Sequence, residues 1–309
     1  REKAKSNLFF DNLKFKKAAI NSKEVNKNDA FFAIKGKKND AHNYLKEVFK
    51  RNASFAIVNK INKKFSKNKQ IKVRNTLSFL SDCASEFRKN IDTNIVAITG
   101  SCGKTSLKDL LVSILNKFYK TSFSKKSYNN KYGVPLTLFN INQDDDFGIL
   151  EVGMDKKGEI DFLSNLIKPN LGVITNINYA HIKNFKNLSE IAAAKGEIIN
   201  NIVDNGSIVL NADDKFYSFH KKLAKKRKLK IYSFSCSKKN TTVNLKKIFK
   251  KGNKFKIVLR IKNSEKYFYI RKNFSNFISN LLAAITVIQI YTDINKLSQN
   301  QFLDVKTTQ

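Results

Sequence analysis

Tryptophan is absent from the 309 residues, and only two prolines, three cysteines and three histidines occur. The thiols of Cys83, Cys102 and Cys236 are scattered, so they predict neither a disulfide framework nor a C-x-x-C metal-binding pair. A reducing cytoplasm is the expected location of such a chain. No apolar run reaches the roughly 18 residues of a membrane-spanning helix, so we expect no membrane span.

Acidic residues are also few, because 25 Asp and Glu stand against 59 Lys and Arg and leave a net charge of +34. An excess of this kind is typical of nucleic-acid-binding proteins. However, Lys, Asn, Ile and Phe are abundant along the whole chain, and their AT-rich codons would be favoured in a compositionally biased genome. Since the lysines form no basic tail, we favour compositional drift and expect no nucleic-acid partner. A positive field would still attract an anionic nucleotide.

The order of the predicted elements indicates an α/β protein with two domains. Residues 1–75 contain two short apolar strands and a helical repeat, which predict a small N-terminal α/β domain. Residues 76–300 alternate strands and helices, which predicts a mostly parallel sheet with helices on both faces. Short strand-like runs between 231 and 272, including 231–234, predict antiparallel pairing at one edge of this sheet.

A glycine-containing loop joins a predicted strand at 95–98 to a predicted helix that follows at once. The loop consists of Thr99, Gly100, Ser101, Cys102, Gly103, Lys104 and Thr105. Glycines let a backbone approach phosphates closely, and the N–H groups of a helix N-terminus attract an anion. Lys104 would bind the β- and γ-phosphates of ATP, and the Thr105 hydroxyl would ligate Mg²⁺. The spacing differs from G-x-x-x-x-G-K-[ST], and a tight glycine turn with an incidental lysine is the alternative.

Two residues after later strands are candidates for the same site. Glu151 ends one predicted strand, and His181 follows the next one. The carboxyl ends of parallel strands face the ligand crevice, where a carboxylate and a neutral imidazole can bind a metal ion. A solvated strand-end charge for Glu151 and a hydrogen-bonded loop histidine for His181 are the alternatives on these residues alone.

Lys195 lies on the apolar stripe of a helix predicted over 188–202. It follows Leu188 by seven residues and Ile191 by four. A lysine in that position must extend to the helix edge, form a pair or lose its charge. The pattern alone leaves two alternatives. Either the side chain extends to solvent at the helix edge, or it is buried with a lowered pKa, as for a modified lysine or one that meets an anion.

Taken in order, the motifs of this chain resemble those of the Mur ligase family of peptidoglycan synthesis. The loop is similar to the family's T-G-x-x-G-K-T, residues 129–138 read N-N-K-Y-G-V-P-L-T-L, and residues 151–154 read E-V-G-M. The matching segments, which span nearly the whole chain, are 32–42, 99–105, 129–138, 151–160, 175–181, 194–198, 210–214 and 279–284.

The resemblance implies an ATP-dependent carboxylate–amine ligase that forms an acyl phosphate. Residues 129–138 and 151–154 are most similar to the members that join D-Ala-D-Ala to UDP-MurNAc-tripeptide, so both are expected small-molecule substrates of a monomer. A ligase for the third amino acid or a folylpolyglutamate-type synthetase is the alternative within this class. Outside it, the alternatives are a non-catalytic nucleotide-binding remnant and a basic nucleic-acid-associated P-loop ATPase.

The resemblance also implies roles for individual residues near the phosphates. Lys104 and the loop amides would hold ATP, and Thr105 with Glu151 would hold one Mg²⁺. His181 and Lys195 would hold a second Mg²⁺, with Lys195 carbamylated into a metal-binding carboxylate. The catalytic residues implied in this way are Lys104, Asn130, His181 and Lys195.

Substrate contacts follow from the same resemblance. Asn280 would contact adenine, and Asn129 and Asn130 would lie near the γ-phosphate and the acceptor carboxylate. Ser22 and Lys35 would belong to the UDP-substrate-binding domain at 1–75.

The chain departs from the family pattern at three places. Residues 21–23 read N-S-K in place of D-S-R, and Asn276 stands where the family often has His. Nothing matches the family's C-terminal domain, so residues 301–309 are expected to be the stub of a linker to an absent domain. The chain also begins with Arg1 rather than Met. These two observations predict a processed or partial product with weak or absent ligation.

Overall fold

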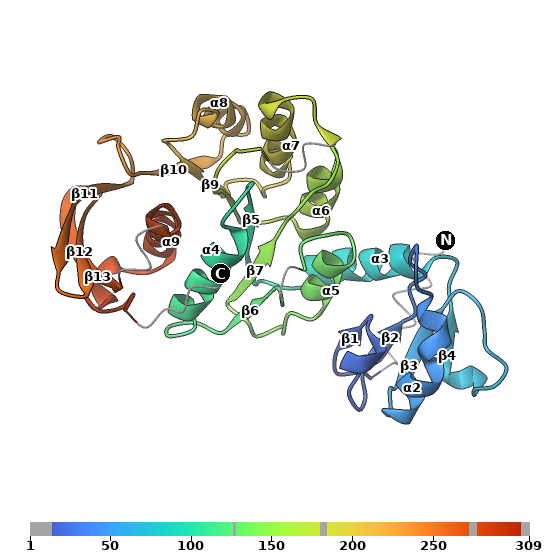
Figure 1. Ribbon diagram of the computed structural model, residues 1–309. Coiled ribbons are helices and arrows are strands. Elements are labelled where there is room, and N and C mark those ends of the chain that lie inside the picture. Colours follow the sequence, from blue (N-terminus) through green and yellow to red (C-terminus); the bar gives the residue numbers. More distant parts are fainter. Residues whose placement is uncertain (1–13, 126–127, 180–183, 272–276, 304–309) are drawn as a thin grey trace. The chain divides into compact units, whose positions relative to one another are not determined.

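The computed structural model describes residues 14–125, 128–179, 184–271 and 277–303, which form two compact units (Figure 1). The first unit contains the chain up to Asn90 together with Leu138–Asn140. Helix α3 (Thr76–Lys89) belongs to it, because α3 packs on strand β2 (Ala30–Phe32), with the Phe79 and Phe32 rings 6.4 Å apart. The sequence pattern alone suggests a boundary before this helix.

The first unit is built on a four-stranded parallel sheet in the order β1-β2-β3-β4. Strands β2 and β3 are buried along their whole length, which is why they read as continuous apolar runs in the sequence. Besides β2 and α3, its elements are β1 (Ala18–Ala19), β3 (Phe55–Val58), β4 (Gln70–Lys72), α2 (Leu45–Lys50), η1 (Ser22–Glu24), η2 (Ala41–Tyr44) and η3 (Lys67–Lys69).

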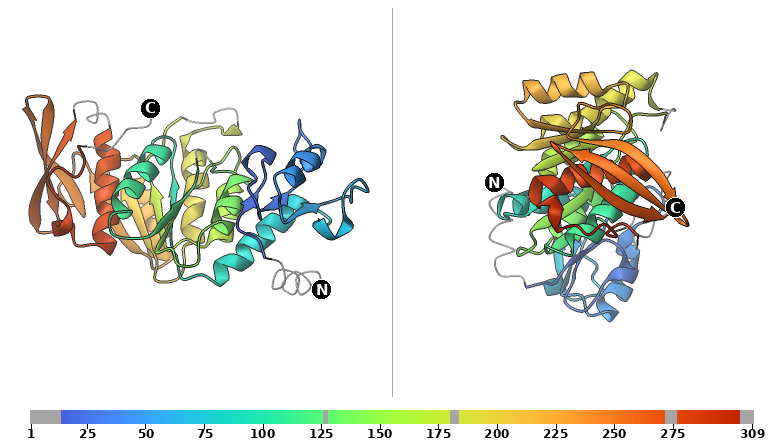
Figure 2. Two further views of the ribbon diagram at one scale, coloured as in Figure 1. Left: turned by 90° about the horizontal axis from the view of Figure 1, so that it is seen from below. Right: turned by 90° about the vertical axis from the view of Figure 1, so that its left-hand side faces the viewer.

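The second unit is built on a nine-stranded sheet in the order β13-β12-β11-β10-β9-β8-β5-β7-β6. Seven strands are parallel, and β12 and β13 complete an antiparallel end beside helix α9 (Figures 1 and 2). Its strands are β5 (Asn94–Thr99), β6 (Thr121–Phe123), β7 (Phe147–Glu151), β8 (Leu171–Ile174), β9 (Ser207–Asn211), β10 (Lys230–Ser235), β11 (Val243–Lys251), β12 (Lys254–Ile261) and β13 (Ser264–Arg271).

The mostly parallel sheet is confirmed, and one expectation about its edge is wrong. The sequence predicts antiparallel pairing for residues 231–234, but β10 runs parallel to β9, with Ile231 opposite Ile208. The reason is that β10 follows helix α8 (Tyr217–Lys226) in a strand–helix–strand crossover, which favours parallel pairing.

Helices cover both faces of the large sheet. Helices α6, α7 and α8 form one layer, and α4 and α9 pack together in the other (Figure 1). The helices after residue 90 are α4 (Lys104–Leu115), α5 (Gly133–Phe139), α6 (Glu159–Ile167), α7 (Leu188–Asn200), α8 (Tyr217–Lys226) and α9 (Ile278–Tyr291), followed by η6 (Ile294–Lys296). No helix within the described residues is long and apolar enough to cross a membrane.

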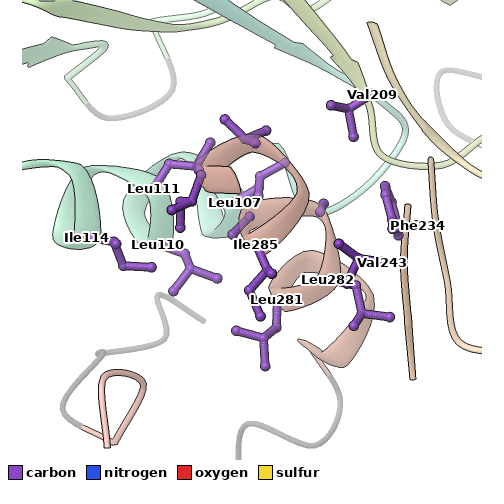
Figure 3. Packing of buried hydrophobic residues seen from close by; sticks show 14 of the residues in the cluster. Leu107, Leu110, Leu111, Ile114, Val209, Phe234, Val243, Leu281, Leu282 and Ile285 are labelled. Atoms are coloured by element: carbon purple, nitrogen blue, oxygen red, sulfur yellow. The ribbon is translucent and has the colours of Figure 1, made fainter. Parts of the chain in front are cut away.

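The contact between α4 and α9 forms the centre of the apolar core. Leu107 and Leu111 of α4 lie against Leu281 and Ile285 of α9 (Figure 3), and all four are buried. This contact holds the N-terminal end of α4, and therefore the loop before it, in a fixed place within the second unit.

Candidate nucleotide-binding site

The loop between β5 and α4 has the tight backbone that its glycines predict. Gly103 has φ 83° at the N-cap of α4, and Gly100 has φ 148°. A Cβ at Gly100 would lie 1.9 Å from Thr175 Oγ1, and one at Gly103 would lie 2.8 Å from the Asn280 amide. Asn280 Nδ2 in turn donates to the Gly103 carbonyl at 3.1 Å. The neighbouring side chains therefore leave room only for glycine at positions 100 and 103.

We expect Gly100→Ala to weaken ATP binding more than tenfold, because the new methyl group would displace Thr175 and with it the loop. The measurement is nucleotide affinity by isothermal titration calorimetry, together with thermal unfolding. Gly252→Ala is the matched control, since Gly252 also has positive φ but a Cβ added there would meet no atom within 4 Å. Equal affinities of the two variants would contradict the steric argument.

Hydrogen bonds from the segment after β8, residues 175–178, hold the loop in this shape. Thr175 Oγ1 donates to the Cys102 carbonyl at 2.7 Å, and Asn176 Oδ1 accepts from the Cys102 N–H at 3.1 Å. Ser101 Oγ donates to the Asn178 carbonyl at 2.8 Å. The sequence places these residues in a family motif but assigns them no role, because contacts between segments so far apart in the chain leave no local pattern.

Glu151 and Thr105 meet below the loop, as their strand-end and helix-start positions predict. Thr105 Oγ1 donates to Glu151 Oε2 at 3.1 Å. The other carboxylate oxygen, Oε1, lies 2.9 Å from Lys108 Nζ in an ion pair. Lys108 Nζ also donates to the Ser124 carbonyl at 2.9 Å. Lys108 and Glu151 are almost fully buried, at 2% and 0% exposed. The Glu151 carboxylate is thus held, away from solvent, between the Thr105 hydroxyl and the Lys108 ammonium.

Two further lysines lie at the loop itself. Lys104 Nζ donates to the Gly100 carbonyl at 2.8 Å, and burial lowers the pKa of Lys104 while the charge of Glu151 opposes this shift. Lys195 of α7 is only 2% exposed, which resolves its position in favour of burial. Burial, reinforced by the charge of Lys104, lowers the pKa of Lys195 to about 7. Because the charge of Lys104 adds to the cost of a charge on Lys195, an anion close to both amines would stabilise them.

A cavity of about 380 Å³ opens next to Lys104. Asn129 and Asn130 line it, as does Gly153, whose N–H donates to the Asn129 carbonyl at 2.7 Å. Asn130 Oδ1 accepts from the Gly133 N–H at 3.1 Å and so caps helix α5. The structure therefore brings the two predicted asparagines together with the loop lysine.

Three predicted site residues are not part of the described site in the second unit. Ser22 and Lys35 belong to the first unit, where the Ser22 hydroxyl donates to Glu47 at 2.8 Å and Lys35 pairs in a β-bridge with Asp40. His181 lies outside the described residues. The uridine contacts and the second-metal role of His181 stay predictions.

The residues below the loop suit a magnesium ion. Among the described residues no group of three His, Cys, Asp or Glu could hold a metal. Mg²⁺ does not need such a group, because it is usually bound by one or two protein oxygens together with water and substrate phosphates. Thr105 and Glu151 offer two such oxygens, which lie 3.1 Å apart.

Comparison with known proteins agrees with this geometry. Residues 98–288 match the Mur ligase middle domain. The UDP-N-acetylmuramoyl-tripeptide–D-alanyl-D-alanine ligase of Buchnera aphidicola subsp. Baizongia pistaciae is 35% identical over 259 residues, which are 83% of this chain and 55% of that protein. The ligase of the same name from Rickettsia prowazekii is 34% identical over 71% of this chain and 49% of its own length. The chain spans about half the length of the curated relatives it matches.

Solved structures show the same fold. MurF from Acinetobacter baumannii superposes with a TM-score of 0.80 at 26% identity, covering 91% of this chain and 61% of that one. MurF from Thermotoga maritima, in complex with ADP, superposes with a TM-score of 0.81 over 96% of this chain and 67% of its own. Its identity is 24%, so this second likeness supports the fold alone.

Proposed function

We propose, on the premise that this chain belongs to the Mur ligase family, that it acts in the ATP-dependent joining of D-Ala-D-Ala to UDP-MurNAc-tripeptide. Relatives named for that activity match most of the chain. The observation that carries the proposal beyond ATP binding is Lys195. A buried amine with a pKa of about 7 beside the phosphate loop suits carbamylation, which would turn it into a metal-binding carboxylate.

The proposed chemistry needs anionic groups to meet without repulsion. The loop N–H groups and Lys104 would neutralise the phosphates of ATP, and Thr105 with Glu151 would hold Mg²⁺, which supplies further positive charge at the transferred phosphate. The acceptor carboxylate then attacks the γ-phosphate, ADP leaves, and an acyl phosphate forms. The amine of the incoming dipeptide attacks the acyl carbonyl, and inorganic phosphate leaves. Positioning and charge neutralisation account for the rate.

The cavity beside Lys104 is the proposed place for the acceptor carboxylate. Asn129 and Asn130 line it with amide groups, and Lys131 adds a positive charge. These groups can donate hydrogen bonds to a carboxylate from one side while Lys104 holds the γ-phosphate on the other.

The decisive experiment measures ADP and phosphate release by the purified chain with UDP-MurNAc-tripeptide, with and without D-Ala-D-Ala. We expect ADP formation to depend on the tripeptide substrate. Because ligation by this chain is expected to be weak or absent, amide product should form slowly at most, and only with the dipeptide. Lys104→Ala should lower the rate by about 10²–10³-fold, as for the loss of one charge-stabilising donor. Phosphate release that ignores both substrates but rises with DNA or RNA would contradict the proposal.

A further inference from the structure

The antiparallel strands of this chain carry an excess of positive charge. Residues 243–271 contain eight Lys and two Arg but a single acidic residue, Glu265. Over the whole chain basic residues outnumber acidic ones by about two to one, from 59 against 25. Residues 215–230 carry a comparable excess, with eight Lys and Arg and no Asp or Glu, so what sets 243–271 apart is where its strands place the charge.

The register of these strands places most of this charge on one side of the sheet. Ile257, Leu259 and Phe268 face the core with α9, so the residues that alternate with them face outward. This outward side is turned to the viewer in the right-hand view of Figure 2. The basic face, as we call it, consists of Lys246, Lys247, Phe249, Lys251, Lys254, Lys256, Val258, Arg260, Glu265, Tyr267, Tyr269 and Arg271.

The single carboxylate on the basic face is already neutralised. Lys246 Nζ lies 2.7 Å from Glu265 Oε1 and reaches it across strand β12. The hydrogen bond and charge of Lys246, with the charges of Lys247 and Arg260, lower the pKa of Glu265. The face therefore carries seven basic side chains against one carboxylate.

Large apolar side chains stand among these cations. Phe249 and Ile248 on β11 are 48% and 42% exposed, and as neighbours in a strand they point to opposite sides of the sheet. Lys256 Nζ lies 4.0 Å from the centroid of the Tyr267 ring, which packs edge-on against Tyr269 at 5.9 Å. The edge at Ile248 and Phe249 is thus apolar on both sides and flanked by lysines.

Protection of an edge strand explains only part of this pattern. Strand β11 pairs with β10 only at Val243 and Asn244, so its remainder is an edge that lysines would shield from other strands. Lys254, Lys256 and Arg260 lie instead on β12, which is paired on both sides. Nor does shielding account for the exposed Phe249, since an apolar group makes an edge more prone to association.

We propose that the basic face and the adjoining apolar edge dock on a membrane surface rich in anionic lipid. Lysine and arginine groups would meet lipid phosphates, while Phe249 and Ile248 enter the interface between headgroups and acyl chains. A single-stranded nucleic acid would stack its bases on exposed aromatic faces of one side. That fits less well, because Lys256 covers Tyr267 and the exposed Ile248 lies on the opposite side.

The absence of tryptophan makes insertion directly measurable, because Phe249→Trp would give the chain a single indole. With vesicles of equal phosphatidylglycerol and phosphatidylcholine we expect a blue shift of its emission and quenching by brominated acyl chains, and neither with phosphatidylcholine alone. Tyr44→Trp is the matched control, since Tyr44 is 45% exposed but lies in the first unit, outside the basic face. No shift at residue 249, or equal shifts in the two variants, would overturn the proposal.

Charge reversal tests the same surface without the new indole. Each basic residue near an anionic bilayer gives roughly a fivefold gain in partitioning, so Lys251→Glu with Lys254→Glu should lower vesicle binding at least about 25-fold. Lys63→Glu with Lys64→Glu makes the same change in net charge on exposed residues of the first unit and should lower it only a few-fold. Equal losses in both pairs, or a loss of single-stranded RNA binding while vesicle binding persists, would overturn the proposal.

Discussion

Lys108→Met is expected to lower the free energy of unfolding by about 3–5 kcal/mol and the rate of ATP turnover by at least about a hundredfold. The stability loss follows because Glu151 would keep a buried charge without its cation, which lies 2.9 Å away in the native protein. The rate loss follows because Lys108 fixes one carboxylate oxygen and thereby aims the other at Thr105, where we propose that Mg²⁺ binds. Urea denaturation in EDTA and steady-state kinetics at several Mg²⁺ concentrations measure the two effects.

A second replacement separates the structural part of this effect from the functional part. In the double variant with Glu151→Gln neither charge remains, so stability should recover by more than half, while turnover should stay low because the proposed metal ligand is lost. Lys108→Arg keeps the charge and should lose less of both. Additive losses of stability in the double variant would show that the ion pair does not hold Glu151, and a normal Mg²⁺ dependence in Lys108→Met would remove its positioning role.

The phosphate loop could be predicted from sequence because the residues that determine its shape are close neighbours in the chain. Gly100 and Gly103 adopt backbone angles that other residues avoid, and Lys104 and Thr105 follow at fixed spacing on the first turn of α4. Lys195 is conspicuous for a similar reason, since a charge on an apolar helical stripe conflicts with burial. Each of these signals lies within one turn or one helix.

Lys108 carries no such signal. It follows Leu107 at the margin of the apolar stripe of α4, where a lysine is usually a solvated helix residue. Its partner Glu151 lies on a different strand far along the chain, and the Ser124 carbonyl that also binds it is a backbone group. Only the folded sheet brings these groups together, so residue type and spacing could not identify the pair.

Strand β11 escapes prediction for a different physical reason. Its sequence V-N-L-K-K-I-F-K-K does not alternate between apolar and polar residues, because a bulge between Leu245 and Lys247 shifts the register and its outer part has one paired edge. The same lysines that hide the strand from a periodicity argument form the basic face. In β11 the departure from regular alternation of apolar and polar residues occurs in a strand that contributes to the basic face.

The unfolding free energy of the Mg²⁺-free protein is expected to rise by about 2 kcal/mol between pH 7 and 9, relative to Lys195→Met. Burial lowers the pKa of Lys195 from 10.5 to about 7 in the folded chain, so between these values the unfolded chain binds more protons. Stability therefore increases with pH across this window, and the cost of the buried charge is largest below pH 7. Urea denaturation in EDTA at several pH values measures the difference, and parallel pH profiles of the two proteins would contradict the lowered pKa.

The same shift has a chemical consequence that can be tested separately. At pH 7 about half of a lysine with this pKa is the neutral amine, against roughly one in 3,000 at the ordinary value. A neutral amine adds to CO₂ to give a carbamate and a proton, so Lys195 should carry one ¹³C-carbamate in the NMR spectrum of protein kept under ¹³CO₂ at pH 8. Lys195→Met should lack this signal and Lys104→Met should keep it, because Lys104 lies at the loop but is not the residue that family resemblance assigns to carbamylation. A wild-type spectrum without the signal, combined with unchanged turnover when CO₂ is removed, would leave Lys195 as a buried cation that binds phosphate directly.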